Sequence, residues 1–219
     1  MNKEKVLDVL KKIFFSFAWI PFVVLAADLA SKWAVQTHLV EDQEVQIIKN
    51  FIYVTLHYNL GAAWSLGYGL RWLWITVSVV LSAGLIFYYV KNIKKLSRPY
   101  LIALTLMIGG AVGNLIDRAC YWNSAVDEFG RTIGPNGVID WILFRFGSYD
   151  FPTFNVADSC LVIGVIILIT CLVIELIQDA IKKNKDGAYS MKPKDYEAKK
   201  EAEKLEENKE ETDAENQSK

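Results

Sequence analysis

Two aspartates stand alone among apolar residues, and they are the side chains of this sequence best suited to catalysis. Asp140 is the one acid of the run VIDWILF (138–144), and Asp158 opens an apolar block with no further charge before Glu175. Two carboxylates brought together in a dry site cannot both ionise readily, so one keeps a proton while the other stays charged. The charged group can take a proton from water while the protonated one polarises a carbonyl, which is the chemistry of amide hydrolysis.

Each aspartate also has a structural interpretation. If Asn155 caps a helix, Asp158 is the third residue of that helix, where it meets the helix dipole and can bond back to the cap. Asp140 lies in a run typical of a buried strand or of a segment dipping into the membrane interface, and no sequence neighbour solvates it. The cap explains Asp158 alone, and a second isolated acid near the same membrane face favours a functional site.

Further polar residues lie beside the apolar blocks. Asp28 and Lys32 are one helical turn apart, and this spacing by itself indicates a structural ion pair. Asn59 and Gly61 lie in YNLGAAWSL, where an amide and a flexible backbone suit either a tight turn or a binding segment.

The stretch IGGAVGNLIDR ends the third apolar block. Gly109 and Gly113 are four residues apart and predict close helix packing. Asn114 and Asp117 share a helical face, and Asp117 could form a local salt bridge with Arg118 that ends the helix. An amide and an ion pair at one membrane boundary indicate a polar network.

The elements that must position these residues are membrane helices. Hydrophobic residues make up 53% of the chain, yet they gather into four blocks and leave the last 35 or so residues almost entirely polar. One block, WLWITVSVVLSAGLIFYYV, is 19 residues without a charge and spans about 28 Å as a helix, close to the thickness of a bilayer core. The sequence predicts a leader (1–12), a four-span domain (13–181) with spans near 13–35, 72–90, 100–116 and 157–177, and a disordered charged tail (182–219). A cleaved signal peptide is the alternative for the first block, but the run is long and has no clear small-x-small cleavage site.

The orientation follows from the basic residues, which favour the cytoplasmic side. They precede the first block, separate the second from the third and follow the fourth: Lys3, Lys5, Lys11, Lys12, Lys91, Lys94, Lys95, Arg98, Lys182, Lys183 and Lys185. Both termini are therefore expected in the cytoplasm, with outer loops near 36–71 and 117–156 that are rich in Trp and Tyr.

Histidine and cysteine offer no competing site. His38 and His57 are the only histidines, and neither forms a Ser–His, Cys–His or metal constellation. Cys120, Cys160 and Cys171 are an odd number. Cys160 and Cys171 would lie about 16 Å apart along one helix, too far for a disulfide. We expect no metal or cofactor.

Taken together, the chain resembles the lipoprotein signal peptidases, the type II signal peptidases of bacteria. Five motifs carry the resemblance in order across 13–177: DLASK (28–32), NLGAAWS (59–65), GGAVGNLIDR (109–118), VID (138–140) and FNVAD (154–158). Any one of them alone is weak evidence, whereas five in order across four spans are strong evidence.

The resemblance implies a membrane aspartic peptidase of the bacterial inner membrane that cuts prolipoproteins before a diacylglyceryl-modified cysteine. It implies four transmembrane helices with a small extracytoplasmic β-cradle and an interfacial helix. The implied partners are prolipoproteins, membrane lipids and globomycin-like cyclic peptide inhibitors, and no nucleic acid. It assigns catalysis to Asp140 and Asp158. The positions that it implies support the dyad, the substrate and the fold are Asp28, Lys32, Asn59, Gly61, Asn114, Asp117, Arg118, Asn155 and Ala157.

Two features depart from the family pattern. Trp64 stands where the family more often has Phe, and the segment between Arg118 and Val138 is longer than expected. Its glycines and Pro135 predict a loop that leaves the dyad intact. The shape of the substrate entrance does not follow from this segment.

Two other functions remain open from the residues. A proton-coupled transporter also needs acids in its spans, although here they gather at one face instead of forming a path. A metal-dependent lipid-head-group transferase could bind Mg²⁺ through several aspartates, although these are scattered singly.

Overall fold

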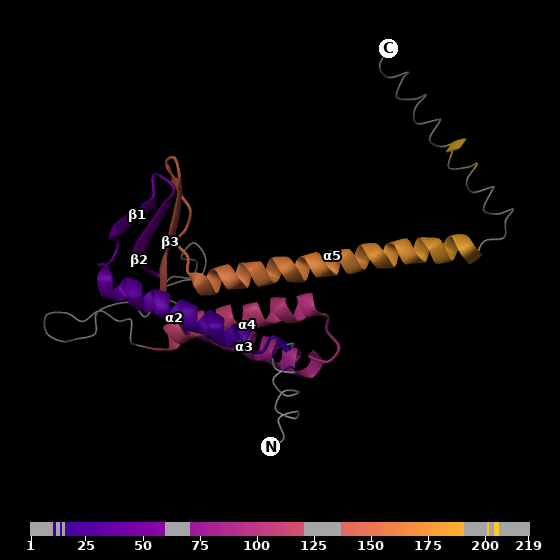
Figure 1. Cartoon of the computed structure of the whole chain (residues 1–219), viewed down its shortest axis with the longest axis horizontal. Helices are drawn as coiled ribbons and strands as arrows, with labels where there is room; N and C mark the ends of the chain where they lie inside the picture. The colour runs from indigo at the N-terminus through magenta and orange to yellow at the C-terminus, as the bar shows by residue number, and fades with distance from the viewer. Residues whose placement is uncertain are drawn as a thin grey trace, which may run out of the picture. The chain divides into compact units, whose positions relative to one another are not determined.

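The computed structural model describes residues 11, 14, 16–59, 71–120, 137–190, 201, 204 and 205. Its helices and strands, in chain order, are α2 (Ile20–His38), β1 (Glu44–Ile48), β2 (Ile52–Asn59), α3 (Arg71–Asn92), α4 (Arg98–Ala119), β3 (Val138–Phe146), β4 (Tyr149–Asp150) and α5 (Val156–Ser190) (Figure 1). The chain divides into two compact units, Met1–Thr170 and Cys171–Lys219. The sheet, the helix packing and the polar site described below lie in the first unit.

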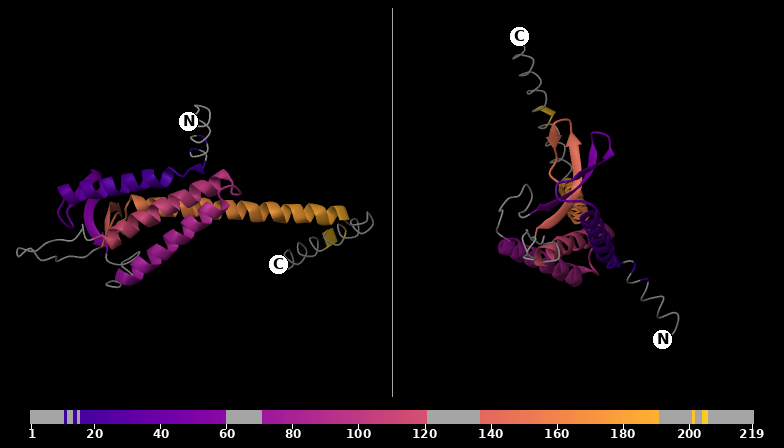
Figure 2. Two further views of the ribbon diagram at one scale, coloured as in Figure 1. Left: turned by 90° about the horizontal axis from the view of Figure 1, so that it is seen from below. Right: turned by 90° about the vertical axis from the view of Figure 1, so that its left-hand side faces the viewer.

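Three helices among the described residues are long and apolar enough to cross a membrane: Trp72–Asn92, Arg98–Ala119 and Val156–Lys183. They cover the second, third and fourth apolar blocks, and they confirm a mostly helical protein of membrane character. Of the most apolar stretch of each helix, 61% is buried in α4 but only 11% in α3. The difference arises because α4 lies between α2 and α3 (Figure 2), while α3 turns most of its apolar side chains outward, where lipid would surround them.

The first helix differs from the expected block 13–35. Residues 17–19 form a turn in which Phe17 has a positive φ of 60°, and α2 begins at Ile20 with Pro21 in its first turn. The helix then continues to His38. Its buried face carries Asp28 and Lys32, and it is not among the three most apolar helices.

The strands form one antiparallel sheet in the order β1-β2-β3-β4. In the chain, β1 and β2 follow α2, and β3 and β4 precede α5. Of the two possibilities for VIDWILF, a buried strand or a segment dipping into the membrane interface, the structure forms the strand β3. On β2, Asn59 pairs with Val138, so Asn59 and Asp140 lie on one sheet face at neighbouring positions. After β4 the chain turns back along β3, where Phe154 pairs with Ile142. This return places Asn155 and the start of α5 beside Asp140.

Glycines on α4 let its neighbours approach closely, as the spacing of Gly109 and Gly113 predicts. A Cβ on Gly109 would lie 2.7 Å from the Val24 Cβ of α2, and one on Gly113 would lie 2.8 Å from Asp28 Oδ2 and 3.1 Å from the Ala157 Cβ of α5. Such contacts are too short for a side chain. Close packing at these two glycines therefore brings α2 and the start of α5 against the end of α4.

Candidate active site

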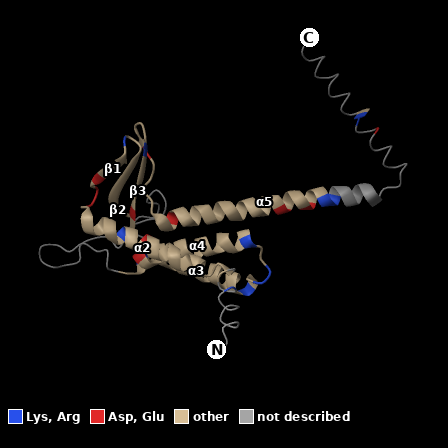
Figure 3. Ribbon diagram, in the orientation of Figure 1, with Lys and Arg blue, Asp and Glu red and all other residues tan. Residues whose placement is uncertain are grey.

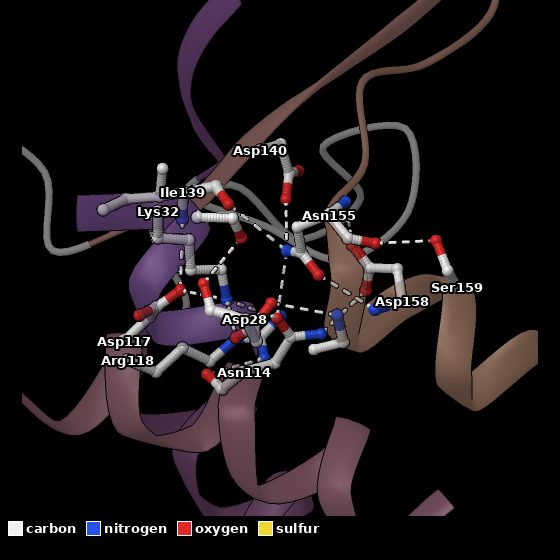
Figure 4. A network of polar contacts seen from close by, with 12 residues as sticks. Asp28, Lys32, Asn114, Asp117, Arg118, Ile139, Asp140, Asn155, Asp158 and Ser159 are labelled. Atoms are coloured by element: carbon white, nitrogen blue, oxygen red, sulfur yellow. Dashed lines mark hydrogen bonds and ion pairs between the residues drawn. The ribbon is translucent and has the colours of Figure 1, made fainter. Parts of the chain in front are cut away.

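A buried group of polar side chains fills the place where α2, α4, the sheet and α5 meet (Figure 4). Asp28, Lys32, Asp117 and Asn155 have no exposed surface, and Asp140 is only 2% exposed. Burying a polar group costs free energy unless it is hydrogen-bonded or paired, so each of these side chains needs a partner within the protein.

Asp158 lies in the first turn of α5. Its backbone N–H donates to Asn155 Oδ1 over 2.9 Å, and its own Oδ2 accepts from the Asn155 backbone N–H over 3.2 Å. This reciprocal pair confirms the cap expected from the sequence. The other oxygen of Asp158 accepts from Asn114 Nδ2 over 2.7 Å, so Asp158 also takes part in the polar site.

Asp140 projects from β3 into the same site. Its Oδ1 accepts from Asn155 Nδ2 over 2.7 Å, and its Oδ2 accepts from Asn59 Nδ2 over 3.0 Å. Burial and, to a smaller extent, the negative charge of Asp158 raise the pKa of Asp140 to about 8, against the opposing effects of Asn59, Lys32 and Asn155. Asp140 is therefore suited to hold a proton at neutral pH.

Asn155 links the two acids through its side chain. Its Nδ2 donates to Asp140, its Oδ1 accepts from the Asp158 backbone, and its Nδ2 also lies 3.1 Å from Asn114 Oδ1. The motif FNVAD (154–158) predicts a supporting role for Asn155, and its position before Asp158 predicts a helix cap. Its contact with Asp140 joins positions 15 residues apart on different elements, which no spacing rule would have identified.

The ion pair expected between Asp28 and Lys32 is present, with 2.6 Å between Asp28 Oδ2 and Lys32 Nζ. Asp117 does not rely on the neighbouring Arg118, as the local salt bridge supposed, because its Oδ2 lies 2.7 Å from Lys32 Nζ. Arg118 Nη1 donates to the Asn114 carbonyl over 3.3 Å. The polar network expected at the end of α4 is thus present, and the ion pair of Asp117 runs between α4 and α2.

Two further contacts come from atoms that the sequence did not single out. The backbone N–H of Ile139 donates to Asp117 Oδ2 over 3.3 Å, and Ser159 Oγ donates to the Asn155 carbonyl over 2.9 Å. A serine four residues after a helix cap is a local signal that could have been used for Ser159. Ile139 carries no such signal because its backbone makes the contact.

Of the two remaining supporting positions, Ala157 is among the described residues and Gly61 is not. Ala157 is fully buried, and its backbone N–H donates to Asp28 Oδ1 over 2.9 Å. Gly61 and Trp64 lie outside the described residues, and so does most of the long segment after Arg118. The interfacial helix has no counterpart among the described elements.

Within the described residues, no histidine or cysteine side chain hydrogen-bonds to this group. His57 is opposite Asp140 in the sheet register, yet its ring nitrogen Nδ1 lies 3.3 Å from the exposed Asp42, and 41% of its side chain is exposed. The three cysteines are free. Within the described ranges, no three His, Cys, Asp or Glu side chains gather so that they could hold a metal ion.

Comparison with known proteins identifies relatives of this arrangement. A family model described as signal peptidase (SPase) II matches residues 20–174. The lipoprotein signal peptidase of Bacillus pumilus is 35% identical over 168 residues, which are 77% of this chain and 96% of the relative. That of Bacillus subtilis is 34% identical over 167 residues, covering 76% and 96%. A solved structure of a bacterial membrane enzyme aligns with a TM-score of 0.62 at 29% identity, covering 75% of this chain and 90% of that one.

Proposed function

The chain belongs to the signal peptidase II family, and we propose that Asp140 and Asp158 are the pair of acids with which it cleaves its substrates. The family's activity is that of this chain: it is a membrane aspartic protease that removes signal peptides from prolipoproteins. Family membership decides between this activity and the transporter or transferase. The matches themselves do not test the roles of particular side chains, and the geometry of the site supports the following ones.

The observation that carries the proposal is that a single side-chain amide, that of Asn155, links the two acids. Asn155 donates to Asp140 and accepts from the backbone of Asp158, while no Lys or Arg of the described chain forms an ion pair with either carboxylate. Acids held by neutral amides keep the freedom to exchange a proton. Acids paired with a buried cation are held in the charged form.

The two acids have different surroundings and hence different roles. Asp158 lies at the start of α5, where the helix dipole favours a negative charge and where two N–H groups donate to its carboxylate. Asp140 is buried in the sheet, and burial raises its pKa. We assign the shared proton to Asp140 and the role of base to Asp158.

The reaction then follows as general acid–base hydrolysis. Asp158 takes a proton from water, whose oxygen attacks the scissile carbonyl carbon, while Asp140 gives its proton to the carbonyl oxygen. The C–N bond breaks as the nitrogen takes the proton from Asp158. Asp140 recovers a proton from the new hydroxyl group, so both acids return to their first state.

The remaining polar residues support this pair. Asn59 and Asn155 orient Asp140, and Asn114 orients Asp158. Arg118 lies near enough for its charge to act on both carboxylates, which suits contact with the substrate backbone. Gly61 stays a proposed supporting position on the basis of the motif NLGAAWS alone.

We further propose that α2 is a fourth span and that the acids face the extracytoplasmic side. Lys32 neutralises Asp28 and Asp117 in part, which lowers the energy needed to place α2 in a bilayer. The basic residues around the α3–α4 connection lie at the end of α4 away from the acids (Figure 3). By the positive-inside rule, that end and both termini are cytoplasmic. The sheet would then be the extracytoplasmic cradle, and residues 182–219 a cytoplasmic tail.

Reporter fusions test this topology. Fusions after residue 95 and at the C-terminus should read as cytoplasmic, and fusions within 40–55 or 125–135 as extracytoplasmic. A C-terminal reporter that reads as extracytoplasmic would overturn the four-span arrangement.

The substrate specificity is also a proposal: cleavage occurs before a cysteine that carries diacylglycerol. The purified protein should be incubated with a lipid-modified prolipoprotein and with the same precursor lacking the lipid. We expect cleavage before the cysteine of the modified precursor alone, insensitivity to EDTA, and inhibition by a globomycin-like cyclic peptide. Equal cleavage of both precursors would contradict the lipid requirement. Loss on chelation that Mg²⁺ restores would contradict the acid pair.

A further inference from the structure

We propose that Lys32 is a positioning residue that sets the geometry of the catalytic pair by joining the three side chains that hold the two acids. This inference rests on the proposed assignment of Asp140 and Asp158. It gives a specific task to a lysine that forms no ion pair with either acid.

The ammonium group of Lys32 has three N–H donors and three acceptors around it. Nζ lies 2.6 Å from Asp28 Oδ2, 2.7 Å from Asp117 Oδ2 and 3.4 Å from Asn114 Oδ1. Lys32 is fully buried, so these protein atoms replace the water that would otherwise surround the charge. Each of the three acceptors leads to a catalytic aspartate.

The first connection runs from α2 to α5. The second oxygen of Asp28 accepts the backbone N–H of Ala157, the residue directly before Asp158, over 2.9 Å. Asp28 also lies against Gly113, where no side chain would fit. The position of the Asp28 carboxylate therefore determines where the first turn of α5 begins.

The second connection runs from α4 to β3. The Asp117 oxygen that contacts Lys32 also accepts the backbone N–H of Ile139, the residue directly before Asp140, over 3.3 Å. The same ammonium group thus holds both carboxylates that anchor the backbone beside the two acids. If Lys32 is lost, both anchors are released and the separation of the acids is no longer determined.

The third connection fixes an amide. Asn114 Oδ1 receives hydrogen bonds from Lys32 Nζ and from Asn155 Nδ2, so its Nδ2 is left to donate to Asp158 Oδ1. Without Lys32, one of the two donors that fix this orientation is gone. The three connections together make Lys32 the shared support of both acids (Figure 4).

The first experiment replaces Lys32 by Met, which has similar length and no donors, in the full-length protein. Among folded molecules, we expect kcat to fall by about 100-fold with little change in KM, because a displacement of about 1 Å has this effect on catalysis. Weaker interaction between separated acids should bring the two limbs of the pH–rate profile closer together. Lys91→Met, at an exposed site on α3, is the matched control and should leave kcat, KM and the profile unchanged.

A second variant, Lys32→Arg, separates geometry from charge. Arg keeps the positive charge but presents a planar set of donors that cannot reproduce the three contacts. We expect kcat to stay low. Recovery of kcat in this variant, or a Lys32→Met profile that shifts to higher pH without narrowing, would show that Lys32 acts by its charge and would overturn the proposal.

If Lys32→Met does not fold, the triple variant Lys32→Met/Asp28→Asn/Asp117→Asn decides, because it leaves no unpaired buried carboxylate at these positions. Asparagine oxygens can still accept from Ala157 and Ile139, but nothing joins them. Low kcat in the folded triple variant supports the proposal, and a kcat equal to that of the unaltered protein overturns it. Activity retained by Asp140→Asn or Asp158→Asn would instead contradict the assignment of the acids. Inactive Asn variants beside fully active Lys32 variants would contradict only the role of Lys32.

Discussion

At two places among the described residues, one basic side chain forms ion pairs with two acidic side chains, once in the interior and once at the surface. Lys32 joins Asp28 and Asp117 in the protein interior, where all three side chains are fully buried. Arg145 joins Glu44 and Asp150 on the sheet, where 26% of its side chain is exposed, as are 40% of Glu44 and 47% of Asp150. The two clusters have the same number of charges, but water reaches only the cluster around Arg145.

The difference shows that burial, more than the number of ion pairs, determines what such a cluster does. Water competes for every contact of Arg145, so its pairs contribute little to stability. No water reaches Lys32, and removing one member of its cluster leaves a buried charge without compensation. The buried cluster can therefore hold backbone groups in place, whereas the exposed one only joins neighbouring strands at the surface.

Replacing either of the two acids proposed to be catalytic should have the largest effect. Asp140→Asn and Asp158→Asn keep the size of the side chain but cannot exchange a proton, and each should lower the cleavage rate by at least about 1,000-fold. The rate should be measured with a lipid-modified prolipoprotein, and folding by gel filtration and thermal unfolding. A well-folded variant with substantial turnover would remove that residue from the pair.

Removing the side chain that links the two acids should have the next largest effect. Asn155→Ala removes the donor to Asp140 and the helix cap of α5, and we expect a rate about 100-fold lower and a loss of about 1 kcal/mol in stability from the cap. Ser159→Ala is the control because, among the described residues, Ser159 Oγ hydrogen-bonds to the Asn155 carbonyl alone. If both variants lose the same activity, the side chain of Asn155 has no special role between the acids.

The pH dependence of the cleavage rate should report the titration of the acid pair and not that of the exposed cluster. Asp140 must be protonated to act as the acid, and its pKa is raised to about 8, so the rate should fall about tenfold per pH unit above that value. At low pH the rate should fall again as the base is protonated. The exposed cluster contributes nothing in this range because Arg145 lowers the pKa of Asp150 and the acids raise the pKa of Arg145. A rate that is unchanged between pH 7 and about 10 would mean that Asp140 is not the acid.

The smallest effect is expected at the exposed cluster. Arg145→Gln removes both surface pairs and the contact of the guanidinium with the Tyr53 ring, yet it should leave kcat and KM unchanged. Its unfolding temperature should fall less than that of Asp28→Ala, which breaks the buried cluster. The opposite order, measured by thermal unfolding in the same detergent, would show that burial does not explain the difference between the clusters.

Local patterns predicted much of this protein, because they depend on neighbours in the chain. The uncharged runs determine three apolar helices, and the apolar run around Asp140 determines a strand. The spacing of Asn155 and Asp158 determines a helix cap, and that of Asp28 and Lys32 an ion pair. All of these contacts act within one turn of a helix or along one strand.

Only the tertiary structure decided which partners the remaining polar groups have. Asp117 pairs with Lys32, 85 positions away, and Asn155 reaches Asp140 because the chain returns along β3 before α5 begins. Close packing at Gly109 and Gly113 brings these elements together, and the buried charges then take the nearest partner because no water is available. Sequence alone determined which acids are isolated from charge along the chain, and folding decided which of them form an ion pair with Lys32 and which accept hydrogen bonds from amides.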